Sequence, residues 1–128
     1  MNNTCFFCNL TEFSYENNSW GVKVSSTQHT LGTMLIILKR HTINFSNLNS
    51  EERDDLFSTF KELESILTKN FKPELFNYLQ LGNQQPHLHL HLVPRYKKEI
   101  LFENKTFRDK NYGDLFKIKK TKESEKII

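Results

Sequence analysis

The sequence predicts an α+β domain with an antiparallel sheet of about five strands, one long helix and a shorter helical segment. Three observations support this class: strand-like segments in the first forty residues, one long segment with helical periodicity, and two later strands separated by a short loop. Strands joined by a short loop are most simply antiparallel. No repeat, low-complexity stretch or Pro/Gly linker divides residues 1–128, so one domain is expected.

The first strands are indicated by period-two and continuous apolar patterns. Residues 21–25 alternate Val22 and Val24 with polar partners, as a half-buried strand does. Residues 33–38 form an almost uninterrupted apolar run, which is typical of a strand buried on both faces.

The periodicity then changes to that of a helix. Asn49 can cap its start, with Glu52 reaching back as in a capping box. Leucine and phenylalanine recur at helical spacing, at Leu56, Phe60, Leu63 and Leu67. We therefore expect an amphipathic helix from about Ser50 to about Lys69, which Pro73 prevents from continuing.

Two more strands are predicted after the helix, and the second of them contains three of the five histidines. Residues 75–81 predict one strand, residues 82–86 a tight loop, and His87-Leu88-His89-Leu90-His91-Leu92-Val93 the next strand. Alternation places the three imidazoles on one face, about 6.6 Å apart, and the leucines in the core. Such a row can line a polar pocket, and buried rings each need a hydrogen-bond partner, so it indicates a chemical site.

Composition limits the classes of partner. The net charge is only +3, and residues 117–128 predict a flexible Lys/Glu-rich tail, so nucleic acid is not expected as a partner. The longest apolar run, residues 34–38, is far shorter than the roughly 20 residues that span a bilayer. The amino terminus also lacks a signal-like pattern, so we expect a cytoplasmic protein without membrane association.

Cys5 and Cys8 are the only cysteines, and their spacing suits two thiolate ligands of a tetrahedral zinc ion. His41 and His87 could supply the other two ligands. A redox-active pair is the alternative, although it would prefer a strand followed by a helix.

The chain resembles the histidine triad family, whose signature is His-x-His-x-His followed by apolar residues. Four features match in order over about residues 5–96: the cysteine pair, the apolar strand with Lys39-Arg40-His41 at its end, the helix, and the triad followed by Pro94-Arg95-Tyr96. The pattern of Phe107, Asp109 and Tyr112-Gly113 resembles some bacterial members.

This resemblance implies a structural zinc held by Cys5, Cys8, His41 and His87, and a homodimer. It assigns His89 as a nucleophile that attacks the α-phosphate of a nucleotide derivative and forms a nucleotidyl-histidine intermediate. An uncharged imidazole can perform this attack at neutral pH. The expected phosphate donors are His91 and the loop residues Gly82, Asn83 and Gln84, with Asn77 as a further contact.

Two residues depart from the family pattern. Many members have Gly-His where this chain has Gly32-Thr33, and Ser25 stands where nucleoside-binding members carry an acidic residue for the ribose. Both changes concern substrate recognition and leave the triad intact.

Three function classes therefore remain open from the sequence. The first is a nucleotidyl hydrolase or transferase with His89 as the covalent nucleophile. The second is a metallohydrolase in which His87, His89 and His91 hold a catalytic metal. The third is a non-catalytic nucleotide-binding protein. The nucleobase and the leaving group are not specified by these residues.

Overall fold

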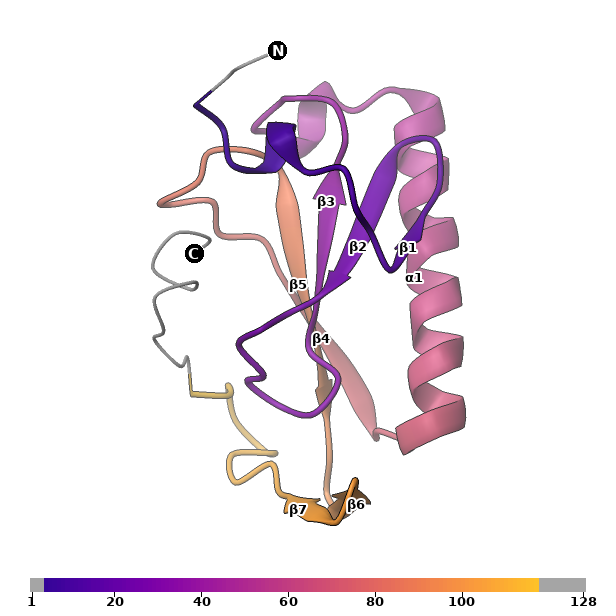
Figure 1. The fold of residues 1–128 in the computed structure, drawn as a ribbon, viewed down its shortest axis with the longest axis vertical. Coiled ribbons are helices and arrows are strands. Elements are labelled where there is room, and N and C mark those ends of the chain that lie inside the picture. Colours follow the sequence, from indigo (N-terminus) through magenta and orange to yellow (C-terminus); the bar gives the residue numbers. More distant parts are fainter. Residues whose placement is uncertain (1–3, 118–128) are drawn as a thin grey trace.

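The computed structural model describes residues 4–117, and its centre is a five-stranded antiparallel sheet with the order β1-β2-β3-β5-β4. The strands are β1 (Tyr15–Glu16), β2 (Trp20–Val24), β3 (Met34–Leu38), β4 (Leu75–Leu79) and β5 (His89–Arg95). One long helix, α1 (Ser50–Phe71), runs along the sheet (Figure 1). The predicted α+β class is confirmed, and the shorter helical segments are two 3-10 turns, η1 (Phe7–Asn9) and η2 (Phe45–Asn47).

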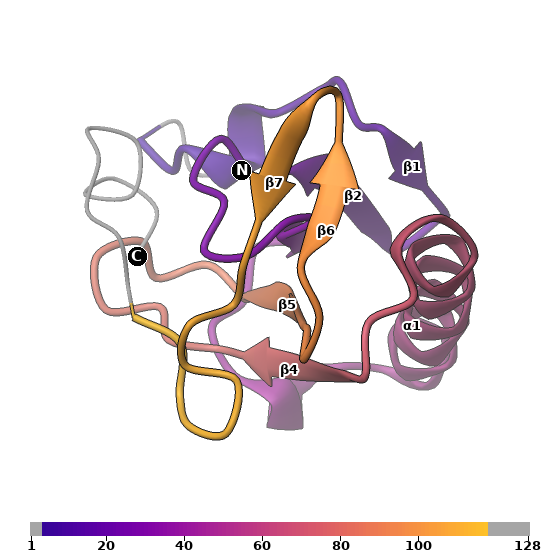
Figure 2. The same cartoon turned by 90° about the horizontal axis from the view of Figure 1, so that it is seen from below.

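A separate hairpin follows the sheet. It consists of β6 (Ile100–Phe102) and β7 (Lys105–Phe107), and Figure 2 shows it in front of the sheet when the molecule is seen from below. Figure 1 places this hairpin at the end of the molecule opposite η1. In residues 4–117 we find no helix with the length and apolar character that a membrane span requires.

The start of α1 is the predicted capping box. The Asn49 side chain accepts a hydrogen bond from the Glu52 backbone N–H at 2.8 Å, and the Glu52 carboxylate accepts from the Asn49 backbone N–H at 2.9 Å. The helix continues two residues beyond the expected end, to Phe71. It ends where Lys72 adopts a left-handed conformation, φ 53°, directly before Pro73.

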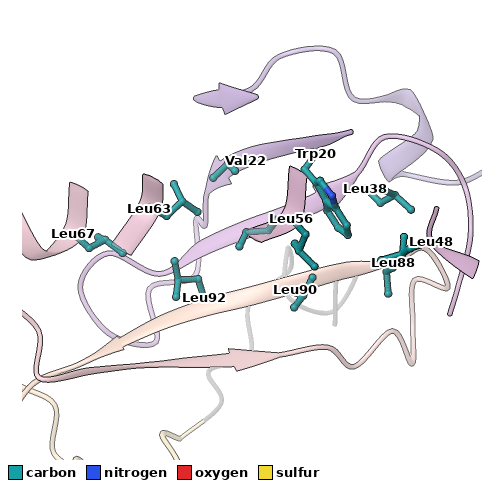
Figure 3. Close-up of a cluster of buried hydrophobic side chains, with 11 residues drawn as sticks. Trp20, Val22, Leu38, Leu48, Leu56, Leu63, Leu67, Leu88, Leu90 and Leu92 are labelled. Atoms are coloured by element: carbon teal, nitrogen blue, oxygen red, sulfur yellow. The ribbon is translucent and has the colours of Figure 1, made fainter. Parts of the chain in front are cut away.

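Alternating residues of the strands build a core between the sheet and α1. Figure 3 shows Val22 and Leu92 from the strands near Leu63 of the helix, and Leu90 near Leu56. Trp20 is fully buried in the same cluster, and its indole N–H donates to the Glu52 backbone carbonyl at 2.8 Å. These contacts fix the helix on one face of the sheet and direct the odd-numbered residues of β3 and β5 to the other face.

The other face is covered by the amino-terminal segment. Phe7, Cys5 and Cys8 pack against Leu35 and Ile37 of β3 in a second apolar cluster. Figure 1 shows η1 near the end of β3 and the start of β5. The histidine face is therefore an interior surface of the molecule.

The predicted boundaries of β4 and β5 were wrong. β4 ends at Leu79 instead of Leu81, and β5 spans residues 89–95 instead of 87–93, so residues 80–88 form a longer connection than the tight loop expected. The cause is long-range pairing: the Leu88 N–H donates to the Thr42 carbonyl at 2.8 Å, so residue 88 contacts the segment after β3. The expected flexible tail lies, apart from Lys117, outside the described residues.

Candidate functional site

The three triad imidazoles lie on the face of the sheet opposite α1. In the register of β5 with β3, His89 is opposite Ile37 and His91 opposite Leu35. The Phe7 ring lies 4.6 Å from the His89 ring and 5.6 Å from the His87 ring, centroid to centroid. The common face is thus confirmed, but all three rings are buried instead of lining an open pocket, and Phe7 of the amino-terminal segment packs against two of them.

Cys5, Cys8, His41 and His87 converge on one point. Their donor atoms all lie within 4.8 Å of one another, although the residues come from three separate segments. The His41 and His87 Nδ1 atoms are 3.1 Å apart, and the Cys8 sulfur lies 3.1 Å from His41 Nδ1 and 3.6 Å from His87 Nδ1. The Cys5 sulfur lies 3.3 Å from His87 Nδ1.

These distances fit a tetrahedral zinc site. With Zn–N bonds of about 2.05 Å and Zn–S bonds of about 2.3 Å, tetrahedral geometry separates N from N by about 3.3 Å and N from S by about 3.5 Å. His87 Nε2 donates to the Leu38 carbonyl at 2.6 Å, which leaves the lone pair on Nδ1 facing the cluster. No disulfide joins the two cysteines. The four side chains are therefore a suitable closed site for a structural metal ion.

His41 is positioned by the residue before it. Arg40 donates from Nε and Nη2 to the Glu52 carboxylate at 2.8 Å each, and from Nη2 to the Asn47 carbonyl at 2.7 Å. The bonds from Arg40 hold the pKa of the Glu52 carboxyl below its usual value, although burial opposes this shift. The end of β3 is therefore tied to the start of α1, and His41 follows from a fixed backbone position.

The His89 ring has a defined tautomer when it is uncharged. Its Nδ1 lies 2.7 Å from the His87 backbone oxygen, which can only accept a hydrogen bond. Nδ1 therefore carries the proton, and Nε2 carries the lone pair. The His89 and His91 ring centroids are 5.5 Å apart.

His91 is buried in an unusual state. Within residues 4–117 neither of its ring nitrogens has a hydrogen-bond partner. Burial, together with the neighbouring His89 and His29 rings, lowers the pKa of His91 to about 4. The ring is therefore uncharged at neutral pH and retains one N–H that can donate to a ligand.

The three triad histidines do not share a metal site. His87 faces the cysteines and His89 is bonded to the His87 backbone, whereas His91 belongs to no group of metal ligands within residues 4–117. The cluster of Cys5, Cys8, His41 and His87 is the one group of converging metal ligands in residues 4–117. This geometry argues against a catalytic metal held by three histidines.

The other predicted contact residues lie in β4 and in the connection between β4 and β5. Gly82 has φ +71°, and Asn83 and Gln84 are exposed in the connection before His87. The neighbouring Gln85, which the sequence did not single out, donates from Nε2 to the Cys5 sulfur at 3.6 Å. The Asn77 side chain accepts from Arg95 Nη1 at 2.8 Å and pairs across the strands with Val93. The phosphate-binding roles of Gly82, Asn83, Gln84 and Asn77 stay predictions.

A buried ion pair beyond the triad was also missed. Arg95 donates to both carboxylate oxygens of Asp109 at 2.6 and 3.1 Å, and their side chains are 2% and 3% exposed. Burial acts to raise the pKa of Asp109, but hydrogen bonds from Arg95 and from the Tyr96 N–H outweigh it and keep the pKa below its usual value. Only the Phe107-x-Asp109 pattern could have indicated this pair.

The fold and the site together define a histidine-triad α+β protein with a Cys₂His₂ cluster. The family model described as "HIT domain" matches residues 11–98. The chain belongs to the HIT family.

Two relatives match this chain over different shares of its length. An "Uncharacterized 16.1 kDa HIT-like protein" of Mycoplasma pneumoniae is 28% identical over 116 aligned residues, covering 79% of this chain and 78% of the relative. A "Bis(5'-adenosyl)-triphosphatase" of Saccharomyces cerevisiae is 33% identical over 72 residues, covering 52% of this chain but only 35% of the yeast protein. The alignment with the yeast enzyme therefore covers only about a third of that enzyme.

Solved structures support the same family. A HIT family protein from Bacillus anthracis superposes with a TM-score of 0.66 at 27% identity, covering 96% of this chain and 86% of that one. A member of the family from Bacillus subtilis gives a TM-score of 0.64 at 25% identity, covering 74% and 75%.

Proposed function

We propose that the protein is a nucleotidyl hydrolase or transferase that cleaves at the α-phosphate of a nucleotide derivative through a covalent intermediate on His89. The observation that carries this proposal is the 2.7 Å contact from His89 Nδ1 to the His87 carbonyl, because it fixes the tautomer that attack by Nε2 requires. The named activity of the yeast relative, a triphosphatase acting on a dinucleoside compound, supports the substrate class.

The reaction divides into two displacements at phosphorus. In the first, the Nε2 lone pair of His89 forms the N–P bond while the P–O or P–N bond to the leaving group breaks and its electron pair leaves with that group. Where the P–N bond breaks, the departing nitrogen takes a proton from solvent and leaves as an amine. The imidazole becomes positively charged, and the His87 carbonyl stabilises it through the Nδ1–H bond. In the second, water or another acceptor attacks phosphorus, loses its proton to solvent and returns the electron pair to Nε2.

His91 is the best donor to the phosphate oxygens. Its ring is buried next to His89, is uncharged at neutral pH, and has no hydrogen-bond partner within residues 4–117. A buried polar group without a partner costs about 1–3 kcal/mol. A phosphate oxygen that accepts the His91 N–H would remove this cost, and most strongly where negative charge develops during displacement.

The proposed zinc has a structural role. Four protein ligands leave no coordination position for water or substrate, so the ion would hold the amino-terminal segment on the sheet. Phe7 lies between the two cysteines in sequence and packs against the buried His89 ring, so Nε2 must become exposed before substrate can reach it.

The proposal is tested by a mass shift on the peptide that contains His89. Zinc-loaded protein is incubated briefly with nucleotide phosphoramidates, dinucleoside polyphosphates and nucleotide sugars, then quenched under conditions that preserve an N–P bond. We expect one nucleotidyl group on wild-type protein and none on His89→Gln, with slower labelling of His91→Gln. Turnover by His89→Gln would refute the covalent mechanism, and nucleotide binding without label or turnover would indicate the non-catalytic class.

The remaining expectations are also part of the proposal. A homodimer could extend the sheet at β4, which is one of its two edge strands, or pack helices, and light scattering would detect it. The single domain, the cytoplasmic location and the absence of a nucleic-acid partner stay predictions.

A further inference from the structure

We propose that a cationic cleft beside the triad binds the phosphate groups of the substrate beyond the α-phosphate, so that the leaving group is a polyphosphate and not a neutral amine. The cleft has a volume of about 260 Å³. His29 forms one wall, and Arg108, Lys110 and Lys117 supply the positive charge. The assignment of these phosphates to a leaving group rests on the proposed function, whereas the anion site itself does not.

His29 connects the cleft to the triad. Its ring centroid lies 6.3 Å from that of His91, which in turn lies 5.5 Å from that of His89. The three rings therefore neighbour one another in succession, from the proposed nucleophile to the wall of the cleft. A chain of phosphates with its first phosphorus at His89 can follow these potential donors.

The loop that carries His29 has a fixed shape. The Gln28 side chain accepts from the Gly32 and Thr33 backbone N–H groups at 2.8 and 3.2 Å and donates to the Ser25 carbonyl at 2.6 Å. The Tyr96 hydroxyl donates to the Leu31 carbonyl at 2.7 Å. His29 therefore projects from a hydrogen-bonded loop instead of a disordered one.

The opposite wall is held by the buried ion pair. Arg95 binds the Asp109 carboxylate and donates to the Asn111 carbonyl at 2.6 Å, which fixes the backbone on both sides of Lys110. The Phe116 ring packs 5.0 Å from the His29 ring and 5.7 Å from the Arg95 guanidinium. The cationic side chains thus extend from fixed positions around an aromatic floor.

Within residues 4–117, no acidic side chain pairs with the three cations of the cleft. Asp109 is the acidic residue in its lining, and both of its oxygens already bind Arg95. Arg108, Lys110 and Lys117 are exposed, and none of them forms an ion pair within residues 4–117. Three cations at one concave surface raise the local concentration of a polyanion, and phosphate oxygens are their natural ligands.

The anion site is tested first without turnover. Binding of inorganic tripolyphosphate to zinc-loaded protein is measured by calorimetry at low salt, and zinc is assayed after each titration so that chelation is not mistaken for binding. Arg108→Gln/Lys110→Gln should weaken binding about tenfold, the effect of removing two partly exposed charge contacts. The matched control is Lys61→Gln/Lys69→Gln, which removes the same charge from exposed positions on α1 and should change binding less than twofold.

The outcomes are distinct. No binding by wild type, or an equal loss in both double variants, would overturn the cleft, because a general charge effect would then suffice. Lys117→Gln is a second, single variant that should also weaken binding. If all variants retain thermal unfolding like wild type, loss of fold does not explain the difference.

The leaving-group assignment needs a second measurement. The ratio of kcat/KM for diadenosine tetraphosphate to that for an adenosine phosphoramidate with a neutral amine should fall about tenfold in Arg108→Gln/Lys110→Gln relative to the α1 control. An unchanged ratio would overturn this assignment. Absence of any label on His89 would instead refute the proposed function, while tripolyphosphate binding would still report on the cleft.

Discussion

A change of pH from 7 to 5 should destabilise the protein through His91. The ring binds a proton with a pKa of about 4 in the folded protein and about 6.5 when exposed. Between these values the unfolded chain binds more protons than the folded one, so the free energy of unfolding decreases as the pH falls. For this single group, the two pKa values give a loss of about 2 kcal/mol between pH 7 and pH 5.

The measurement compares wild type with His91→Leu, which removes the titrating ring but keeps an apolar side chain of similar size. Urea unfolding of each zinc-loaded protein at pH 7 and at pH 5 gives its free energy of unfolding at both values. The difference between the two is the loss of stability of that protein. Protonation of the zinc ligands contributes to the loss in wild type and in the variant alike. The zinc content of each protein is therefore assayed at both pH values. The wild-type loss should exceed the variant loss by about 2 kcal/mol. Equal losses would show that the folded protein tolerates a charged His91.

Three further sets of substitutions test separate parts of the structure. His87→Ala should release zinc and lower stability, whereas His89→Ala should keep a full equivalent of zinc by elemental analysis; loss of metal from both would contradict the assigned ligands. Asp109→Asn should lower the free energy of urea unfolding by about 3–5 kcal/mol because Arg95 becomes a buried charge without its partner, and a change below about 1 kcal/mol would refute this. Asn49→Ala should cost about 1 kcal/mol while Asn49→Ser costs much less, and equal effects would exclude a capping role.

Local signals predicted most of the fold. The cap at Asn49 and the repeat of leucines specify α1 without help from distant residues, and alternation specifies which side of a strand is buried. The start of β5 was wrong because it depends on a non-local bond, from the Leu88 N–H to the Thr42 carbonyl. His87 continues the alternating pattern of β5 in the sequence, yet it lies before the first residue of that strand, His89.

The metal cluster was predictable because its ligands follow recognisable segments: a cysteine pair, the end of a buried strand, and the start of the triad. The role of His29 could not be predicted in this way, because its position next to His91 depends on how the loop before β3 folds. One signal was available in the sequence. Thr33 stands where many family members have a histidine, and His29 lies four residues before it.

The boundary of β5 also explains how neighbouring histidines acquire different roles. His87 lies before the ladder, and its ring turns towards Cys5 while its Nε2 is held by the Leu38 carbonyl. His89 is the first residue of β5, and its Nδ1 is held by the backbone oxygen of His87 itself. The residue that belongs to the metal cluster therefore also supplies the acceptor that fixes the tautomer of the proposed nucleophile. A structural site and a reactive ring are coupled through one carbonyl group, so the position of His87 influences the chemistry of His89 although its own ring takes no part in the displacement.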